Sequence, residues 1–154
     1  MPILMSIKPR FSRLIFSGEK KYELRKTPIK NKSDNMVIVY ESAPTKAIVG
    51  SFTINGVVRK SPNELWRDLK QDIGISKIEF FTYFQQNQWG YAIEVGNPKL
   101  FKRRISLNEL REHQNSWNPP QNFQYLKRNS EIEFIINKTS SPKDLISSIS
   151  RNER

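Results

Sequence analysis

The chain of 154 residues contains no cysteine and only one histidine. Without cysteine it has no disulfide, no thiolate catalyst and no cysteine-ligated zinc, a usage typical of the cytoplasm, where we expect this protein. The single histidine, His113, excludes a paired-histidine nuclease mechanism, and no acidic cluster accompanies it, so we expect no metal and no other cofactor. No apolar run reaches the roughly 18 residues that a bilayer crossing requires, so we expect no membrane partner.

Positive charge, by contrast, is abundant and unevenly distributed. The chain has 26 Lys and Arg against 15 Asp and Glu, a formal net charge of +11. Residues 1–32 hold nine Lys or Arg and two Glu, residues 99–128 hold seven and two, and the remaining segments are close to neutral. A face that binds a polyanion explains this segregation better than an ordinary basic surface that keeps the protein soluble, which is the alternative.

The pattern of apolar residues predicts one domain of the α+β class. Short apolar or alternating runs predict strands at residues 3–7, 20–25, 36–40, 48–54, 88–95 and 132–136. Asn55-Gly56 fits either a tight turn or a bulge within a longer bent strand. Helix signals are a Pro9 start with a Gly18 stop, capping boxes at Ser61, Ser76 and Ser106, and a final start at Ser141. This order predicts a small β-barrel with helices inserted between strands.

The residues with the clearest chemical meaning are Lys20, Glu23 and Arg25, which follow Gly18 in the spacing Gly-x-Lys-x-x-Glu-x-Arg. In a cleft, Lys20 could bind a phosphate or, if desolvated, act as a base. Glu23 could accept from the amino edge of a base or act as a general base, and Arg25 could clamp a phosphate. The alternative is a solvated Lys20 beside an exposed Glu23–Arg25 ion pair, which stabilises by less than about 1 kcal/mol.

Further binding candidates lie outside this motif. Lys8 and Arg10 stand at the start of the first helix, where the helix dipole disfavours cations unless an anion binds there. Arg103 and Arg104, in the second basic segment, are interpreted as phosphate contacts. Three aromatic residues flank or follow two prolines in one loop and are candidates for stacking on bases: Trp117, Phe123 and Tyr125.

The motif from Gly18 to Arg25, preceded by Ser6-Ile7-Lys8-Pro9 and a helix, resembles the ASCH family of the PUA-like superfamily. Further matching segments are Val37–Tyr40 with Ser42-x-Pro44, Ser61-Pro62-x-Glu64-Leu65-Trp66, Phe80–Phe84, Trp89-Gly90-Tyr91-Ala92-Ile93, and Pro119-Pro120-Gln121-x-Phe123-x-Tyr125-Leu126. The resemblance covers about residues 3–126. It implies a PUA-like domain over residues 1–128, followed by a partly ordered extension over residues 129–154.

The resemblance also implies a function. ASCH proteins are described as RNA-binding or coactivator-associated modules, and some bacterial members resemble ribonucleases. We therefore expect the cleft beside the motif to recognise RNA or a modified nucleotide, with DNA or a protein as alternative partners. If the chain is an enzyme, Lys20 and Glu23 would be catalytic. A subgroup that hydrolyses N4-acetylcytidine uses Gly-x-Lys-x-x-Thr-x-Arg, and Glu23 replaces that threonine here.

Overall fold

The computed structural model describes residues 2–30 and 35–140. In these ranges the strands are β1 (Ile3–Ile7), β2 (Tyr22–Arg25), β3 (Met36–Glu41), β4 (Ala47–Lys60), β5 (Gly90–Ser106) and β6 (Phe123–Tyr125). The helices are α1 (Pro9–Ser17), α2 (Pro62–Leu69), α3 (Lys77–Tyr83), α4 (Leu107–His113) and α5 (Glu131–Ser140). The strands form one curled sheet in the order β2-β5-β4-β3-β1-β6, a half-barrel that confirms the predicted α+β barrel class.

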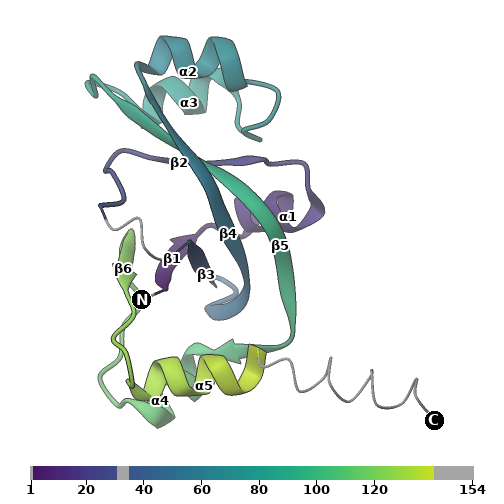
Figure 1. Ribbon diagram of the computed structural model, residues 1–154, viewed down its shortest axis with the longest axis vertical. Coiled ribbons are helices and arrows are strands. Elements are labelled where there is room, and N and C mark those ends of the chain that lie inside the picture. Colours follow the sequence, from purple (N-terminus) through teal and green to yellow (C-terminus); the bar gives the residue numbers. More distant parts are fainter. Residues whose placement is uncertain (1, 31–34, 141–154) are drawn as a thin grey trace, which may run out of the picture.

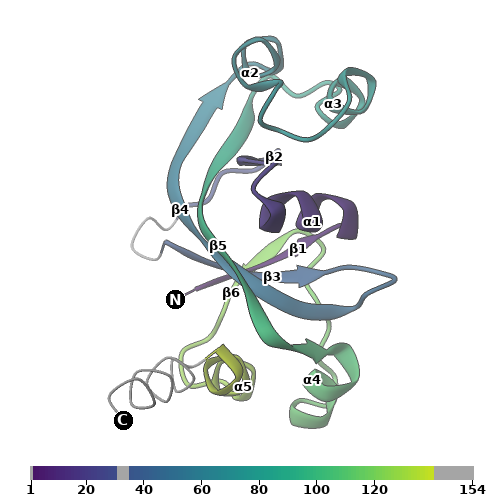
Figure 2. The ribbon, with the colours of Figure 1, turned by 90° about the vertical axis from the view of Figure 1, so that its right-hand side faces the viewer.

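The helices occupy three places around this sheet. Figure 1 shows α2 and α3 at one end of the molecule and α4 and α5 at the other, with α1 between them. The view in Figure 2 shows that β4 and β5 run the length of the molecule as one bent ribbon. None of the helices in the described ranges has both the length and the apolar character that crossing a membrane demands.

The bend of the ribbon has a local cause in irregular pairing between β4 and β5. The register shifts at three places, one of them between Ile54 and Gly56, so Asn55-Gly56 belongs to a bulge in a long strand and not to a turn. Gly50 lies where a Cβ atom would be 2.4 Å from the backbone oxygen of Lys99 and 2.8 Å from the Phe16 ring. A side chain at this position would push β5 away from β4 and the Phe16 ring of α1 away from the sheet.

Helix α1 begins and ends as its sequence predicts. Pro9 occupies its first turn, and Gly18 ends it with φ +88°, a conformation that glycine adopts without strain. The Ser61, Ser76 and Ser106 side chains each accept a hydrogen bond from the backbone N–H three residues later, as the capping boxes predict. The predicted helix at Ser141 lies outside the described residues.

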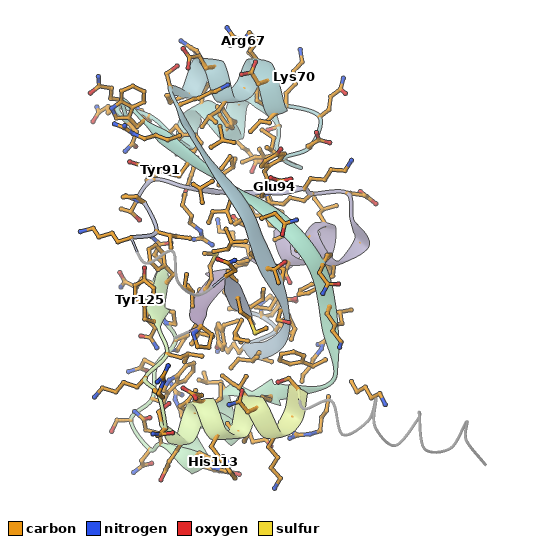
Figure 3. All side chains as sticks on the ribbon, in the orientation of Figure 1. Arg67, Lys70, Tyr91, Glu94, His113 and Tyr125 are labelled. Atoms are coloured by element: carbon orange, nitrogen blue, oxygen red, sulfur yellow. The ribbon has the colours of Figure 1, made fainter. Side chains whose placement is uncertain are left out.

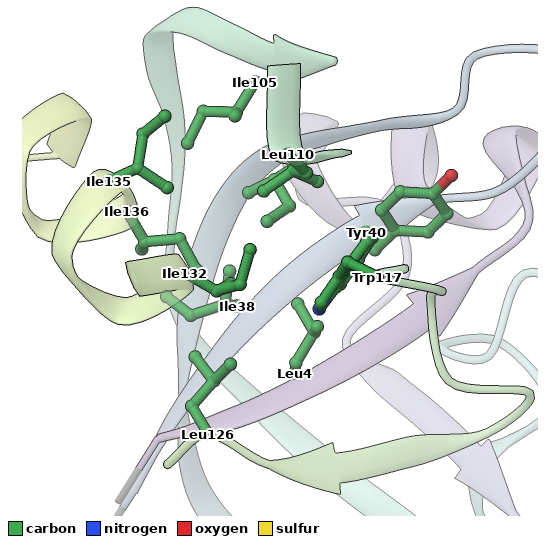
Figure 4. Close-up of a cluster of buried hydrophobic side chains, with 11 residues drawn as sticks. Leu4, Ile38, Tyr40, Ile105, Leu110, Trp117, Leu126, Ile132, Ile135 and Ile136 are labelled. Carbon is green, nitrogen blue, oxygen red and sulfur yellow. The ribbon is translucent and has the colours of Figure 1, made fainter. Parts of the chain in front are cut away.

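The predicted strand at residues 132–136 is wrong, because this segment forms helix α5. Isoleucines at 132, 135 and 136 share one helical face and join a buried cluster with Leu4 and Ile38 from the sheet (Figure 4). Ser130 accepts from the backbone N–H of Glu133 at 3.1 Å, a capping interaction that the sequence pattern contained. A residue pair at i and i+4 fits both periodicities, and packing against the sheet selects the helix.

Candidate functional site

A cavity of about 570 Å³ opens beside the motif. Its walls come from six parts of the chain: the end of β1 with the start of α1, strand β2 with the residues just before it, the end of β3 with the turn after it, helix α3 with the loop before it, helix α4, and residues 119–121. Lys20, Glu23 and Arg25 all line it, so the structure brings together the three motif side chains that the sequence singled out. Gly18 does not line the cavity, and its conformation at the end of α1 explains the glycine.

Lys20 is a buried lysine, with only 2% of its surface exposed. Its Nζ donates to the backbone oxygen of Ile73 at 2.5 Å and lies 5.1 Å from the centroid of the Phe11 ring. Burial lowers the pKa of Lys20, the negative charge of Glu23 opposes that shift, and the positive charge of Arg25 adds to it. Lys20 is therefore not the solvated loop lysine of the alternative interpretation.

Glu23 is also buried, with 6% of its surface exposed. Its Oε1 accepts from the backbone N–H of Leu24 at 3.2 Å and lies 3.8 Å from Nη2 of Arg25. Its Oε2 is buried and has no hydrogen-bond partner among the described residues. An unpartnered oxygen on a buried carboxylate is unusual, because such a group normally loses its hydration only in exchange for hydrogen bonds.

Arg25 connects three segments that line the cavity. Its Nη1 donates to Oδ1 of Asn122 at 2.8 Å, and its Nη2 donates to the backbone oxygen of Ser6 at 3.0 Å. The Ser6 hydroxyl in turn donates to the backbone oxygen of Pro120 at 2.6 Å. The Nε atom of Arg25 is buried and has no partner among the described residues. The guanidinium thus holds β1, β2 and the loop before β6 in place, while its Nε–H donor makes no hydrogen bond to the described residues.

The sequence did not single out four further side chains that line the cavity: Tyr40, Lys46, Tyr83 and Arg111. The Tyr83 hydroxyl donates to the backbone oxygen of Leu24 at 3.3 Å, and burial raises the pKa of Tyr83. Burial likewise raises the pKa of Tyr40, against the lowering effect of Arg111. The sequence signals for these residues were indirect: Lys46 follows the Ser42-x-Pro44 segment, Tyr83 lies in the matching segment Phe80–Phe84, and Arg111 belongs to the second basic segment.

The predicted cations lie in different places. Lys8 is exposed and lines the cavity. Arg10, at the start of α1, instead forms an exposed ion pair with Glu79 of α3. Arg103 and Arg104 lie on β5 and do not line this cavity, and Arg103 Nη1 donates to both carboxylate oxygens of Glu109, at 2.9 and 2.7 Å.

The aromatic candidates also lie apart from the cavity. Trp117 is a core residue, 5% exposed, and its ring packs edge-on against Tyr40 with the centroids 5.9 Å apart (Figure 4). Its predicted availability for base stacking is wrong, because the loop with two prolines turns the indole inward. Phe123 and Tyr125 lie half-buried on β6, with ring centroids 6.3 Å apart. The described residues contain no group of three or more His, Asp or Glu side chains that could hold a metal ion.

Comparison with known proteins identifies several relatives of this chain. An ASCH domain-containing ribonuclease from Zymomonas mobilis is 25% identical over 137 residues, which are 89% of this chain and 91% of that protein. The crystal structure of the Zymomonas mobilis ASCH protein superposes with a TM-score of 0.81 at 24% identity, covering 90% of this chain and 96% of that one. Large ribosomal subunit protein uL22 from Ureaplasma parvum is 32% identical over 126 residues, 81% of this chain but only 39% of that protein.

A more distant structure, human THYN1 in complex with 5-methylcytosine-containing DNA, shares the fold with a TM-score of 0.52 at 15% identity, covering 91% of this chain and 98% of that one. These similarities confirm the PUA-like architecture that the motif suggested. The ASCH domain model matches residues 5–124, which is most of the chain. With its half-barrel sheet and with Lys20, Glu23 and Arg25 of its motif lining one cavity, the chain belongs to the ASCH domain family.

Proposed function

We propose that this protein binds RNA and that one nucleotide enters the cavity beside Lys20, Glu23 and Arg25. The observation that carries the proposal is the unused hydrogen-bonding capacity of the motif. Glu23 Oε2 and Arg25 Nε are both buried and without partners among the described residues. A base edge could satisfy both, because it offers donors and acceptors side by side in one plane.

The size and lining of the cavity support a nucleotide as its ligand. At about 570 Å³ it falls within the range of small-molecule sites. Aromatic side chains of Phe11, Tyr40 and Tyr83 line it, and aromatic surfaces are common partners for unstacked bases in RNA. Lys8 and Lys46, both exposed, are placed to meet phosphates outside the cavity.

Fluorescence anisotropy with a labelled single-stranded RNA and a DNA of the same sequence tests this proposal. We expect Glu23→Gln to weaken RNA binding about 10- to 100-fold, the value of a hydrogen bond to a charged group. The matched control is Glu94→Gln, since Glu94 is exposed on β5 outside the cavity (Figure 3). Equal affinity of Glu23→Gln and Glu94→Gln for RNA, with both variants folded, would refute the proposal. Equal affinity for DNA and RNA would show that the 2′-hydroxyl takes no part in recognition.

A second candidate function is cleavage of the bound RNA, favoured by the named activity of the Zymomonas mobilis relative. Glu23 Oε2 would take the proton of a ribose 2′-hydroxyl, and the 2′-oxygen would attack the adjacent phosphorus. The bond to the 5′-oxygen breaks, the Lys20 ammonium protonates that leaving group, and Arg25 stabilises the charge that develops on the phosphate. The products would be a 2′,3′-cyclic phosphate and a 5′-hydroxyl end.

Labelled RNA incubated in EDTA distinguishes binding from cleavage. We expect Lys20→Gln and Glu23→Gln to abolish the cyclic-phosphate product, while Glu94→Gln retains it. A single 2′-deoxy substitution at the cut site should also block cleavage, because it removes the nucleophile. Turnover that is unchanged in Lys20→Gln and Glu23→Gln would assign the activity to a contaminant. A parallel assay with N4-acetylcytidine tests the amidohydrolase chemistry that the motif resembles.

A further inference from the structure

A second hollow of about 360 Å³ lies at the end of the molecule formed by α4 and α5. Figure 1 shows these two helices at the same end, and Figure 3 places His113 there, at the opposite end from Arg67 of α2 and from Lys70, which follows α2. Residues from three elements line the hollow: Lys102 and Arg103 of β5, Glu109 and His113 of α4, and Phe134 and Lys138 of α5.

Phe134 is the unusual member of this group. It is 65% exposed, although α5 buries three isoleucines, at 132, 135 and 136, at 2–4% exposure. Packing of the helix on the sheet therefore does not use the phenyl ring, which instead faces a concave, solvent-open site. An exposed aromatic ring on the rim of a hollow is a typical contact surface for a ligand.

The hollow is also positively charged. Three of its lining residues are cations, Lys102, Arg103 and Lys138, and Glu109 is its one carboxylate. Arg103 is held in place, because its Nη1 contacts Glu109 and its Nη2 donates to the Thr139 hydroxyl at 3.3 Å. Cations that surround an exposed aromatic ring form the combination that binds single-stranded nucleic acid, through phosphate contacts and base stacking.

Helix α4 connects this hollow to the first cavity. Leu107 and Arg111 line the first cavity, whereas Glu109 and His113 of the same helix line the second. A strand leaving the first cavity around α4 thus reaches the second within the width of one helix. A flat lipid surface fits the concave shape poorly.

We propose that this hollow is a second nucleotide subsite, in which a base stacks on Phe134 while Lys102, Arg103 and Lys138 face the phosphates of the same RNA strand. The inference rests on the proposed function, because it extends the RNA path from the first cavity.

Anisotropy with labelled oligouridylates of one to ten nucleotides tests the proposal. We expect Phe134→Ala to leave the mononucleotide affinity unchanged and to weaken binding of the longest oligomer about 5- to 100-fold, the usual effect of losing one stacked base. Phe134→Trp should restore that affinity. The control is Ile78→Ala, since Ile78 is 82% exposed on α3 at the other end of the molecule.

A second pair of variants tests the charge of the hollow independently of the ring. Lys138→Gln should lower the salt dependence of long-oligomer binding, and Lys70→Gln, at the exposed residue that follows α2, should not. The proposal is overturned if Phe134→Ala binds the longest oligomer as tightly as the wild type does. It is also overturned if the wild type binds anionic phospholipid vesicles and Phe134→Ala loses that binding in place of RNA binding. Loss of mononucleotide binding in Glu23→Gln, measured separately, reports on the proposed function and not on this subsite.

Discussion

The two basic regions of this chain look alike in sequence, but the structure buries charged side chains only in the first. In the first, Lys20 and Glu23 are buried and Arg25 is half-buried along one cavity; Lys20 and Arg25 donate to backbone oxygens, and Arg25 lies beside Glu23. In the second, Arg103 and Arg104 lie exposed on β5. Charge density along the sequence is therefore a guide to the class of partner, but it does not separate a recognition site from an electrostatic surface.

The difference has a physical consequence for each region. Buried charges hold a defined geometry, because every displaced hydration contact has to be replaced by a protein or ligand contact. Exposed cations keep much of their water and attract phosphates of any sequence. We therefore expect the first region to determine which nucleotide binds, and the second to determine how strongly binding depends on salt.

The largest expected difference between the regions is in stability. Arg25→Ala leaves the Glu23 carboxylate buried without its ion-pair partner and removes the donors to Ser6 and Asn122. Breaking a buried pair in this way costs about 3–5 kcal/mol. Arg103→Ala removes an ion pair whose arginine side chain is 59% exposed, so it should cost less than about 1 kcal/mol. Urea unfolding measures the free energy of unfolding of both variants. Similar losses of stability in Arg25→Ala and Arg103→Ala would contradict the expected difference between the two regions.

The salt dependence of RNA binding should also differ between variants of the two basic regions. Each phosphate contact that is lost should reduce the slope of log affinity against log salt by roughly 0.7 for a single strand. Arg104→Gln should show such a reduction, because Arg104 is exposed on β5. Glu23→Gln should weaken binding and leave the slope unchanged. A reduced slope in Glu23→Gln would mean that this carboxylate acts through the general electrostatic field.

The smallest expected effect concerns pH and Lys20. Burial lowers the pKa of Lys20 below its ordinary value of 10.5. Between the lowered pKa and 10.5 the unfolded chain binds more protons than the folded one, so this group makes the free energy of unfolding rise with pH. Lys20→Met should remove that rise, whereas the exposed neighbour variant Lys21→Met should keep it. Urea midpoints measured from pH 7 to pH 10 compare the two, and parallel curves would contradict the expectation.

Much of the local structure followed from the sequence because its causes are local. Pro9, Gly18 and the three serine caps predicted where helices begin and end, and the alternation from Gln88 onward predicted a strand. The errors arose where the sequence allows two solutions. The isoleucines of α5 fit a strand as well as a helix, and the loop around Trp117 could expose or bury its indole. In both cases, contact with Ile38 or Tyr40 on the sheet decided the outcome.

The sequence by itself determined the class of fold, the start and end of helix α1 before the motif and the identity of the three motif side chains, since these depend on neighbours along the chain. Only the tertiary structure decided which charges are buried and what they contact. Lys20 meets a backbone oxygen 53 residues away and Arg25 meets an amide 97 residues away. Such partners are set by how the sheet curls and the strands pair, and no local propensity encodes them.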